Sequence, residues 1–427
     1  MSGRHSPQDA ADFHDSPAYT FPPSPWHGKW IWAPDSQPGD GRQVVALRHV
    51  LELDAVPESM PARMSAVSRY ALWVNGIEVS RGPVRANPRR QPYDDLDLAP
   101  HLRPGVNVIA ALVWRYDGAK PWWTPLSFLA NDLHEGAFVF EAAGIGTGSH
   151  WQARALPGWG EEVSDRLSGR GVEHADTRSL PADWLTAAAV DWPRALTRRA
   201  VTTGEPGRAE PPSFPGGPLE PRPIGRPDPA DVVLRSAGTA GPAHVHLAER
   251  IESGTLVVDA SGPAGATVTV RVAEFLDADG LPAPSEHDAC FAVTLDGTRR
   301  TTESLDLYGF RGALVETTAG AVVHELAVRT RTHPASGGTF QSSDPRVDQI
   351  WAVGRRTVTL CSSDAYIDCP TREQRAWVGD AVVHQMVDFA TSTDWRLARW
   401  YPRLAASPRA RGRTRACGRW RNVSART

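Results

Sequence analysis

The spacing of apolar residues changes once along this chain of 427 residues, and that change sets the fold class. Before Asp344, apolar residues gather in short runs broken by glycine and proline, as in 70–74 and 106–114. After Asp344 they recur at helical spacing, beginning with Val347 and Ile350. Short runs between turn residues predict strands, and a spacing of three to four residues predicts helices. The sequence therefore predicts a multidomain protein in which β-sandwich domains precede a group of helices.

Local turn signals predict how some strands pair. Asn75-Gly76 is typical of a two-residue hairpin turn, because both positions of such a turn need positive φ. Residues 256–260 and 267–272 flank a short turn sequence at 261–265, which predicts a second hairpin-like pair.

Helix boundaries are predicted from capping residues. Asp344 followed by Pro345 is typical of an N-cap and a first helical turn. A second helix is predicted to begin near Pro370 and to run through Phe389, and Asp394 is predicted to cap a third.

These patterns divide the chain into six predicted segments. They are a disordered lead-in (1–25), an N-terminal β-sandwich of carbohydrate-binding type (26–160), a mixed segment with a proline-rich linker (161–230), a second β-sandwich (231–335), the start of a helical domain (336–406) and a basic tail (407–427).

Charge and composition exclude several classes of protein. The net charge is −3, but the acid-free stretch from residue 403 to 427 holds eight arginines, which leaves −11 for the rest of the chain. An acidic body argues against nucleic-acid binding. The absence of a long apolar stretch argues against a membrane span, and no secretory signal is visible. Four scattered cysteines predict neither a disulfide framework nor a metal site, so a reduced, cytoplasmic compartment is expected, and no cofactor motif is found.

Carboxylates are concentrated in one segment of the helical part. Asp368, Glu373 and Asp380 lie within thirteen residues, and on a helix from Pro370 the last two would share one face with Trp377 between them. A glycosidase uses one carboxylic acid to protonate the leaving oxygen and another carboxylate to activate water or attack. Aromatic rings give a sugar an apolar surface to stack on.

A structural interpretation of the same segment stays open at this point. Carboxylates in the first turn of a helix are favoured by the helix dipole. Arg372 and Arg375 could pair with them without any ligand. Spacing alone favours this interpretation.

The motif also resembles a known family. Residues 368–381 resemble the Asp-Cys-Pro-x-Arg-Glu-x-x-x-Trp-x-Gly-Asp-Ala signature of bacterial α-L-rhamnosidases, which are inverting glycoside hydrolases with a six-hairpin (α/α)₆ barrel behind several β domains. Residues 343–351 look like the helix that enters that barrel, and residues 256–280 are similar, more weakly, to the β domain before it. The resemblance spans roughly residues 26 to 402.

The resemblance implies roles for five residues. Glu373 would be the general acid, Asp368 and Asp380 would bind rhamnose hydroxyls, and Arg372 and Trp377 would line the same subsite. The partners would be rhamnose-containing glycans or glycosides, with no metal and no cofactor. One departure from the family pattern, at residues 374–376, is expected to touch neither proposed carboxylate.

The family's general base is a glutamate much later in the barrel, and this sequence ends at Thr427. A chain truncated within its barrel is therefore expected to be inactive by itself, with apolar faces of its helices partly exposed, among them Ile350, Met386 and Leu397.

A different class of function remains as the alternative. A non-catalytic carbohydrate-binding β-domain protein would explain the tryptophan-rich N-terminal part, in which Trp122-Trp123 could form a stacking platform or belong to the core. The basic tail could be a binding arm or the product of a premature or out-of-frame end.

Overall fold

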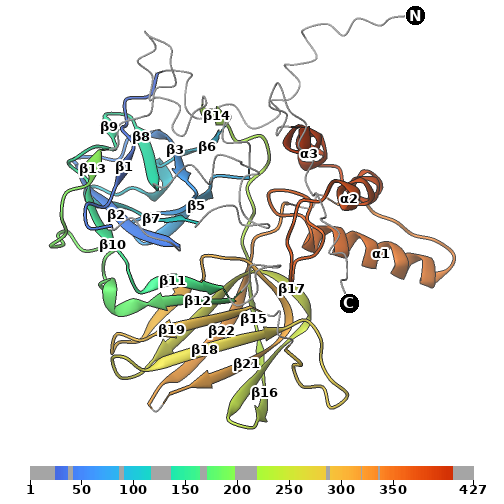
Figure 1. Ribbon diagram of the computed structural model, residues 1–427. Helices are drawn as coiled ribbons and strands as arrows, with labels where there is room; N and C mark the ends of the chain where they lie inside the picture. The colour runs from blue at the N-terminus through green and yellow to red at the C-terminus, as the bar shows by residue number, and fades with distance from the viewer. Residues whose placement is uncertain are drawn as a thin grey trace, which may run out of the picture.

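The computed structural model describes residues 25–36, 42–85, 91–116, 136–163, 171–197, 219–284, 289–318, 320–334 and 337–406. Two β-sandwiches stack on each other, and three helices lie beside their junction (Figure 1). This confirms the predicted fold class of β-sandwiches followed by helices. The predicted lead-in up to residue 24, Trp122-Trp123 and the tail from residue 407 lie outside the described residues. Within the described residues, no helix combines the length and apolar character that crossing a membrane requires.

The N-terminal sandwich consists of a seven-stranded and a five-stranded sheet. The strands of the first, in spatial order, are β13 (Leu196–Thr197), β1 (Ile31–Trp32), β8 (Ala137–Ala142), β3 (Pro61–Val67), β6 (Gln91–Asp97) and β14 (Leu219–Pro221), with β9 (Ile145–Gly146) paired to β8. The strands of the second are β10 (Gln152–Ala155), β2 (Gln43–Leu53), β7 (Gly105–Arg115), β4 (Arg69–Val74) and β5 (Ile77–Gly82).

The hairpin predicted at Asn75-Gly76 is confirmed. It joins β4 to β5, and both residues take the positive φ that the turn requires, 52° and 86°. The Asn75 side chain also accepts a hydrogen bond from the backbone N–H of Val108 at 3.0 Å, which ties the turn to β7.

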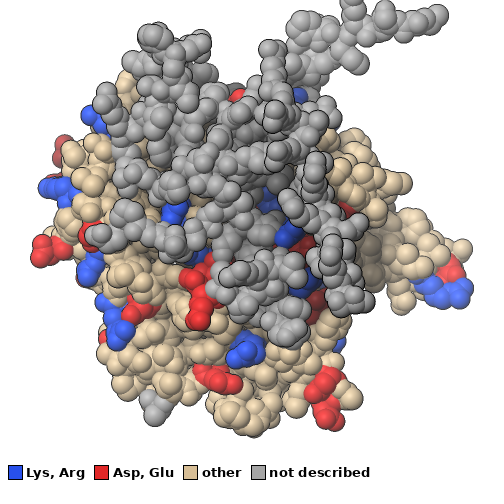
Figure 2. All heavy atoms as spheres, in the orientation of Figure 1, with Lys and Arg blue, Asp and Glu red and all other residues tan. Residues whose placement is uncertain are grey.

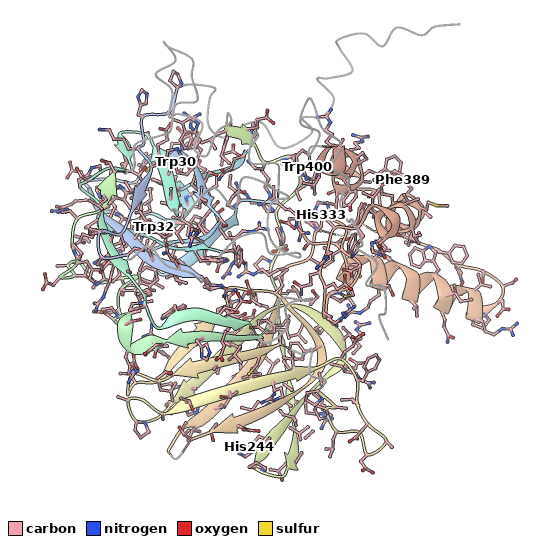
Figure 3. All side chains as sticks on the ribbon, in the orientation of Figure 1. Trp30, Trp32, His244, His333, Phe389 and Trp400 are labelled. Carbon is pink, nitrogen blue, oxygen red and sulfur yellow. The ribbon has the colours of Figure 1, made fainter. Side chains whose placement is uncertain are left out.

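The five-stranded sheet is buried on both faces, which explains why β2 is apolar at consecutive positions. Val45 and Leu47 face the interior of the N-terminal sandwich. Val44 and Ala46 face the other way and join a core that continues into the second sandwich. The two sandwiches therefore share a hydrophobic core. Trp30 and Trp32, labelled in Figure 3, are also buried in the N-terminal sandwich, as expected for core tryptophans.

The second sandwich is one ten-stranded sheet folded on itself around β17 (Ala243–Ser261). The first part of β17 pairs with β16 and β21, and its last part pairs with β20 and β22, with a register shift near residues 247–252. A strand that changes partners at such a bulge can belong to both layers. The other strands are β11 (Trp159–Val163), β12 (Gly171–Asp176), β15 (Asp231–Val233), β16 (Arg235–Ala240), β18 (Thr267–Ala273), β19 (Cys290–Thr294), β20 (Arg300–Glu303), β21 (Tyr308–Thr317) and β22 (Val322–Thr330).

The predicted hairpin between residues 256–260 and 267–272 is wrong. The end of β17 pairs with β20 and β22, whereas β18 pairs with β19 and β21. The segment between β17 and β18 thus crosses from one layer to the other. The physical reason is that strand pairing here is set by partners 40 or more residues away in the chain, which a local turn sequence does not encode.

The predicted mixed segment 161–230 supplies strands to both sandwiches. β11 and β12 join the ten-stranded sheet, whereas β13 and β14 return to the seven-stranded sheet. Across the junction, Arg42 at the start of the five-stranded sheet pairs with Asp306, Glu173 and Glu161 of the second sandwich. Glu173 also accepts hydrogen bonds from the Leu305 backbone N–H at 2.6 Å and from other groups.

This junction predicts a pH-dependent stability. Burial, reinforced by the charge of Asp306, raises the pKa of Glu173 from 4.5 to about 7. A carboxyl whose pKa is higher in the folded chain stabilises the fold most below pH 4.5, and that contribution is lost as the pH rises through 7. We expect the free energy of unfolding to fall as the pH rises through this range. Glu173→Gln should flatten this slope in urea titrations at pH 5 and pH 7.5, and an unchanged slope would contradict the assignment.

Three helices follow the second sandwich: α1 (Pro345–Leu360), α2 (Val378–Thr391) and α3 (Arg396–Ala406). Two predicted N-caps are confirmed, because carboxylate oxygens of Asp344 and Asp394 each accept the backbone N–H two residues ahead at 3.0 Å. The predicted start of the second helix near Pro370 is wrong, since α2 begins at Val378. The reason lies in the turn described below.

The helices bury only one side of their apolar surface. Leu397 of α3 is 1% exposed, so its predicted exposure is wrong. Ile350 of α1 and Met386 of α2 are 71% and 68% exposed, as predicted. Phe389, labelled on α2 in Figure 3, is also exposed. On the face drawn in Figure 2, the uncovered surface of this part is mostly uncharged, apart from acidic and basic groups at its outer end.

Candidate functional site

The predicted site residues lie in the loop between α1 and α2, residues 361–377, and in the first turn of α2. The loop runs beside the junction of the two sandwiches (Figure 1). Its first part is held under the helices by buried Tyr366, whose hydroxyl donates to Asp388 of α2 at 2.5 Å.

The second part of the loop is closed by Asp368. Its backbone N–H donates to the Arg375 carbonyl at 3.0 Å, and its side chain accepts the Arg375 N–H at 2.8 Å. These two bonds join the ends of an eight-residue turn. Asp368 is thus partly a structural residue, although it is half-buried rather than covered.

Gln374 explains why the helix does not start at Pro370. It adopts a φ of 51°, which a right-handed helix cannot contain. Its side-chain amide donates to the carbonyls of Pro370, at 2.7 Å, and of Leu307 in the second sandwich, at 3.1 Å. A buried side chain that reaches another domain therefore overrides the local preference for helix.

Glu373 lies at the outer side of this turn, and its carboxylate contacts three side chains. The Trp377 indole N–H donates to one oxygen at 3.1 Å, and Arg372 donates to the other at 2.6 Å. Arg375 stands 3.8 Å from the same carboxylate, with its guanidinium over the Trp377 ring. The Glu373 side chain is 23% exposed, so water or a ligand can reach it.

Further carboxylates surround the turn. Burial raises the pKa of Asp368, and the negative charges of Glu373 and Asp380 act in the same direction. Burial also raises the pKa of the Cys361 thiol to about 12, assisted by Asp368, Asp380 and Glu274. Asp380 is exposed on the first turn of α2. The structure thus brings the three predicted carboxylates into one electrostatic neighbourhood.

The shared helical face predicted for Glu373 and Asp380 is wrong in its geometry. Glu373 belongs to the turn, and only Asp380 lies in α2. Trp377, the N-cap residue of α2, still contacts Glu373, but it does so through the shape of the turn and not along a helix.

The residues that fix this turn were not predicted from the sequence. Gln374 was noted only as a departure from the family pattern, and Asp364, which binds arginines of the N-terminal sandwich, had no sequence signal. Their roles depend on groups far away in the chain, so a local pattern could not show them.

Metal-binding clusters and cavities were sought among the described residues. These residues contain no group of three or more His, Cys, Asp or Glu side chains arranged to hold a metal ion. A small cavity of about 20 Å³ lies between His333, α1 and the end of α2, but it is lined by none of the five predicted site residues. His333 is labelled between the second sandwich and the helices in Figure 3.

Comparison with known proteins agrees with the resemblance. Residues 335–415 match the family model of the bacterial alpha-L-rhamnosidase 6 hairpin glycosidase domain. Among curated proteins, no relative matches the chain.

Solved structures show the same fold over most of the chain. The GH78 family rhamnosidase of Bacillus sp. GL1 matches with a TM-score of 0.68 and 17% identity, over 89% of this chain and 63% of that one. The alpha-L-rhamnosidase of Dictyoglumus thermophilum matches with 0.66 and 16%, over 88% and 44%. The Streptomyces avermitilis alpha-L-rhamnosidase complexed with L-rhamnose matches with 0.64 and 21%, over 84% and 35%. The present chain thus spans less than two thirds of each of these proteins.

Proposed function

Because residues 335–415 match the family model of the bacterial alpha-L-rhamnosidase 6 hairpin glycosidase domain, we propose that this chain carries the acid-bearing and sugar-binding part of a rhamnosidase site. The observation that supports this most directly is the turn at 368–377, which presents Glu373 beside Trp377 and close to two further carboxylates. The proposed reaction is hydrolysis of terminal α-L-rhamnosyl residues.

Glu373 is the proposed general acid. A general acid must reach the glycosidic oxygen and hold a proton until the bond breaks. Glu373 is partly exposed and is oriented by the Trp377 indole N–H, which leaves the other carboxylate oxygen to Arg372. Arg372 is exposed and can move away from that oxygen when a sugar binds.

The sugar is proposed to lie between the turn and the start of α2. Asp380 has an exposed carboxylate that can accept hydrogen bonds from sugar hydroxyls. Asp368 contributes a second carboxylate, and the half-exposed Trp377 offers an apolar ring face. L-Rhamnose is the first ligand to test, since the Streptomyces avermitilis enzyme was solved with it.

Hydrolysis is proposed to proceed with inversion. An inverting enzyme needs a second carboxylate about 6.5–9.5 Å from the acid, so that a water fits between that carboxylate and the sugar.

The described residues contain three helices of a domain named for six hairpins. Sugar binding is therefore the first property to measure on this chain. Inversion is tested by proton NMR of the first sugar anomer released in a polypeptide with the complete domain.

Rhamnose affinity gives the direct test of the proposed sugar site. Asp368→Asn and Asp380→Asn are expected to weaken L-rhamnose binding about tenfold each, because hydrogen bonds to a charged group contribute about 1.5–3 kcal/mol. Calorimetric titration measures this. The matched control is Asp344→Asn, which changes a carboxylate that caps α1 and should lower stability without changing affinity. If the first two variants lower only the melting temperature, both carboxylates are structural.

A non-catalytic carbohydrate-binding protein is the alternative function. It would bind sugars on the N-terminal sandwich, where Trp30, Trp32 and Trp114 are buried but Trp26 and Trp73 are partly exposed. Binding to a glycan array that persists in Glu373→Gln and Asp380→Asn would favour this alternative.

The proposed location is the cytoplasm. The three described cysteines are free thiols, which suits a reducing compartment.

A further inference from the structure

The loop that carries Glu373 is anchored to the N-terminal sandwich by a buried carboxylate. Asp364 lies in this loop, and its carboxylate is bound by two arginines of that sandwich. Arg69, the first residue of β4, donates to it at 2.7 Å. Arg85, in the segment after β5, donates its backbone N–H at 2.7 Å and places its Nε 3.3 Å away. All three side chains are less than one tenth exposed.

Arg85 also reaches the turn itself. Its Nη1 donates to the backbone carbonyl of Gln374 at 3.5 Å, a long hydrogen bond. Gln374 lies between two residues that matter here. Glu373 comes directly before it, and Arg375, whose backbone N–H closes the turn, comes directly after it. On its other side, the Gln374 side chain donates to Leu307 of the second sandwich. The residue next to Glu373 is thus held between the two sandwiches.

We infer that Arg85 and Asp364 are positioning residues, through which the N-terminal sandwich sets the place of Glu373. The side chain of Arg85 links the buried Asp364 to the Gln374 carbonyl, so the two ends of the loop are held by one rigid group. A reacting carboxylate must be placed within a fraction of an ångström, and buried second contacts supply that precision. The consequence for catalysis rests on the proposed function, whereas the anchoring of the turn does not.

The same contacts could instead serve only to hold the domains together. That role would lower the stability of the whole chain when Arg85 is changed. Positioning predicts something different, which is a local loosening of residues 368–375. The two are separated by measuring hydrogen–deuterium exchange along the full-length chain by mass spectrometry, together with its melting temperature.

In Arg85→Met and Asp364→Asn, the amides of Asp368 and Arg375 are expected to exchange at least tenfold faster, because they close the turn on each other. Peptides from β18 and β19 should exchange as in the unchanged chain. The matched control is Arg63→Met, which breaks an equally buried pair with Glu141 inside the N-terminal sandwich. It should lower the melting temperature and leave 368–375 protected.

Equal exchange at 368–375 in Arg85→Met and Arg63→Met, or a uniform rise along the chain, would overturn the inference. If Arg85→Met does not fold, Arg85→Lys keeps a charge near Asp364 but lacks the planar group that reaches both partners. It should show the same local rise, smaller in size. A fully protected turn in Arg85→Lys together with a lower melting temperature would also count against positioning.

A binding measurement separates this inference from the proposed function. L-Rhamnose affinity is titrated in the unchanged chain and in Arg85→Met. Weaker binding in Arg85→Met, with binding retained in Arg63→Met, supports positioning of the sugar site. If the unchanged chain binds no L-rhamnose, the proposed function fails, and the exchange experiment still decides whether Arg85 positions the turn.

Discussion

Glu373→Gln is expected to lower kcat for alkyl α-L-rhamnosides by about two to four orders of magnitude, the usual contribution of a general acid. The measurement needs a polypeptide that carries residues 337–406 within a complete six-hairpin domain. Glutamine keeps the size of the side chain and can still accept the Trp377 N–H, which lies 3.1 Å from the carboxylate, but it has no proton to give. An activated aryl rhamnoside needs little protonation of its leaving group and should lose much less.

The comparison of the two substrates identifies the role. Equal losses on alkyl and aryl rhamnosides would remove Glu373 from the acid role and leave it as a sugar ligand. The control is Arg372→Gln, because this exposed side chain also contacts the carboxylate. Arg372→Gln should change KM, but it should leave the ratio of kcat on the alkyl rhamnoside to kcat on the aryl rhamnoside nearly unchanged.

Limited proteolysis is expected to cut the described chain first between residues 337 and 406 and to leave the two sandwiches intact. Ile350 and Met386 are exposed on α1 and α2. Each large apolar side chain left in water forgoes roughly 1.5–3 kcal/mol of burial, so these helices are held weakly. Mass spectrometry of the fragments after a short digestion locates the first cuts. A full-length chain that resists digestion would show that the helices are stable without further neighbours.

Two matched variants test the reason for such cleavage. Leu397→Ala removes a buried side chain of α3 and should destabilise the helices by about 2–5 kcal/mol, with faster cutting. Met386→Ala removes an exposed one and should change their stability by no more than about 0.5 kcal/mol. Similar cutting of both variants would contradict the burial pattern.

The accuracy of the sequence predictions depended on how local each feature is. The hairpin at Asn75-Gly76 and the cap at Asp344 were predicted correctly, because a few adjacent residues determine them. The partners of β17 were not, because they lie on strands distant in sequence. The start of α2 was wrong for the same reason, since the positive φ of Gln374 is supported by Leu307 of another domain.

The residues of the candidate site also fall into those that a local pattern predicts and those that only the fold reveals. The family-like signature predicted Asp368, Glu373 and Asp380, and the charges of Glu373 and Asp380 both raise the pKa of Asp368. The roles assigned to them stay predictions. Asp364 and its arginines could not be found from sequence, because Arg69 and Arg85 precede Asp364 by more than 270 residues and only the fold brings them together.

The exchange of strands between the sandwiches limits how such a chain can be recombined in evolution. β12 follows β10 in the chain but pairs with β19 in the second sandwich, and β13 then returns to pair with β1. A gene break near residue 160 would leave the N-terminal part without β13 and β14, and it would cut through β11, the outer strand of the second sandwich's sheet. Open sheet edges of this kind promote aggregation. The two sandwiches are therefore expected to be inherited, and transferred between genes, as a single cassette.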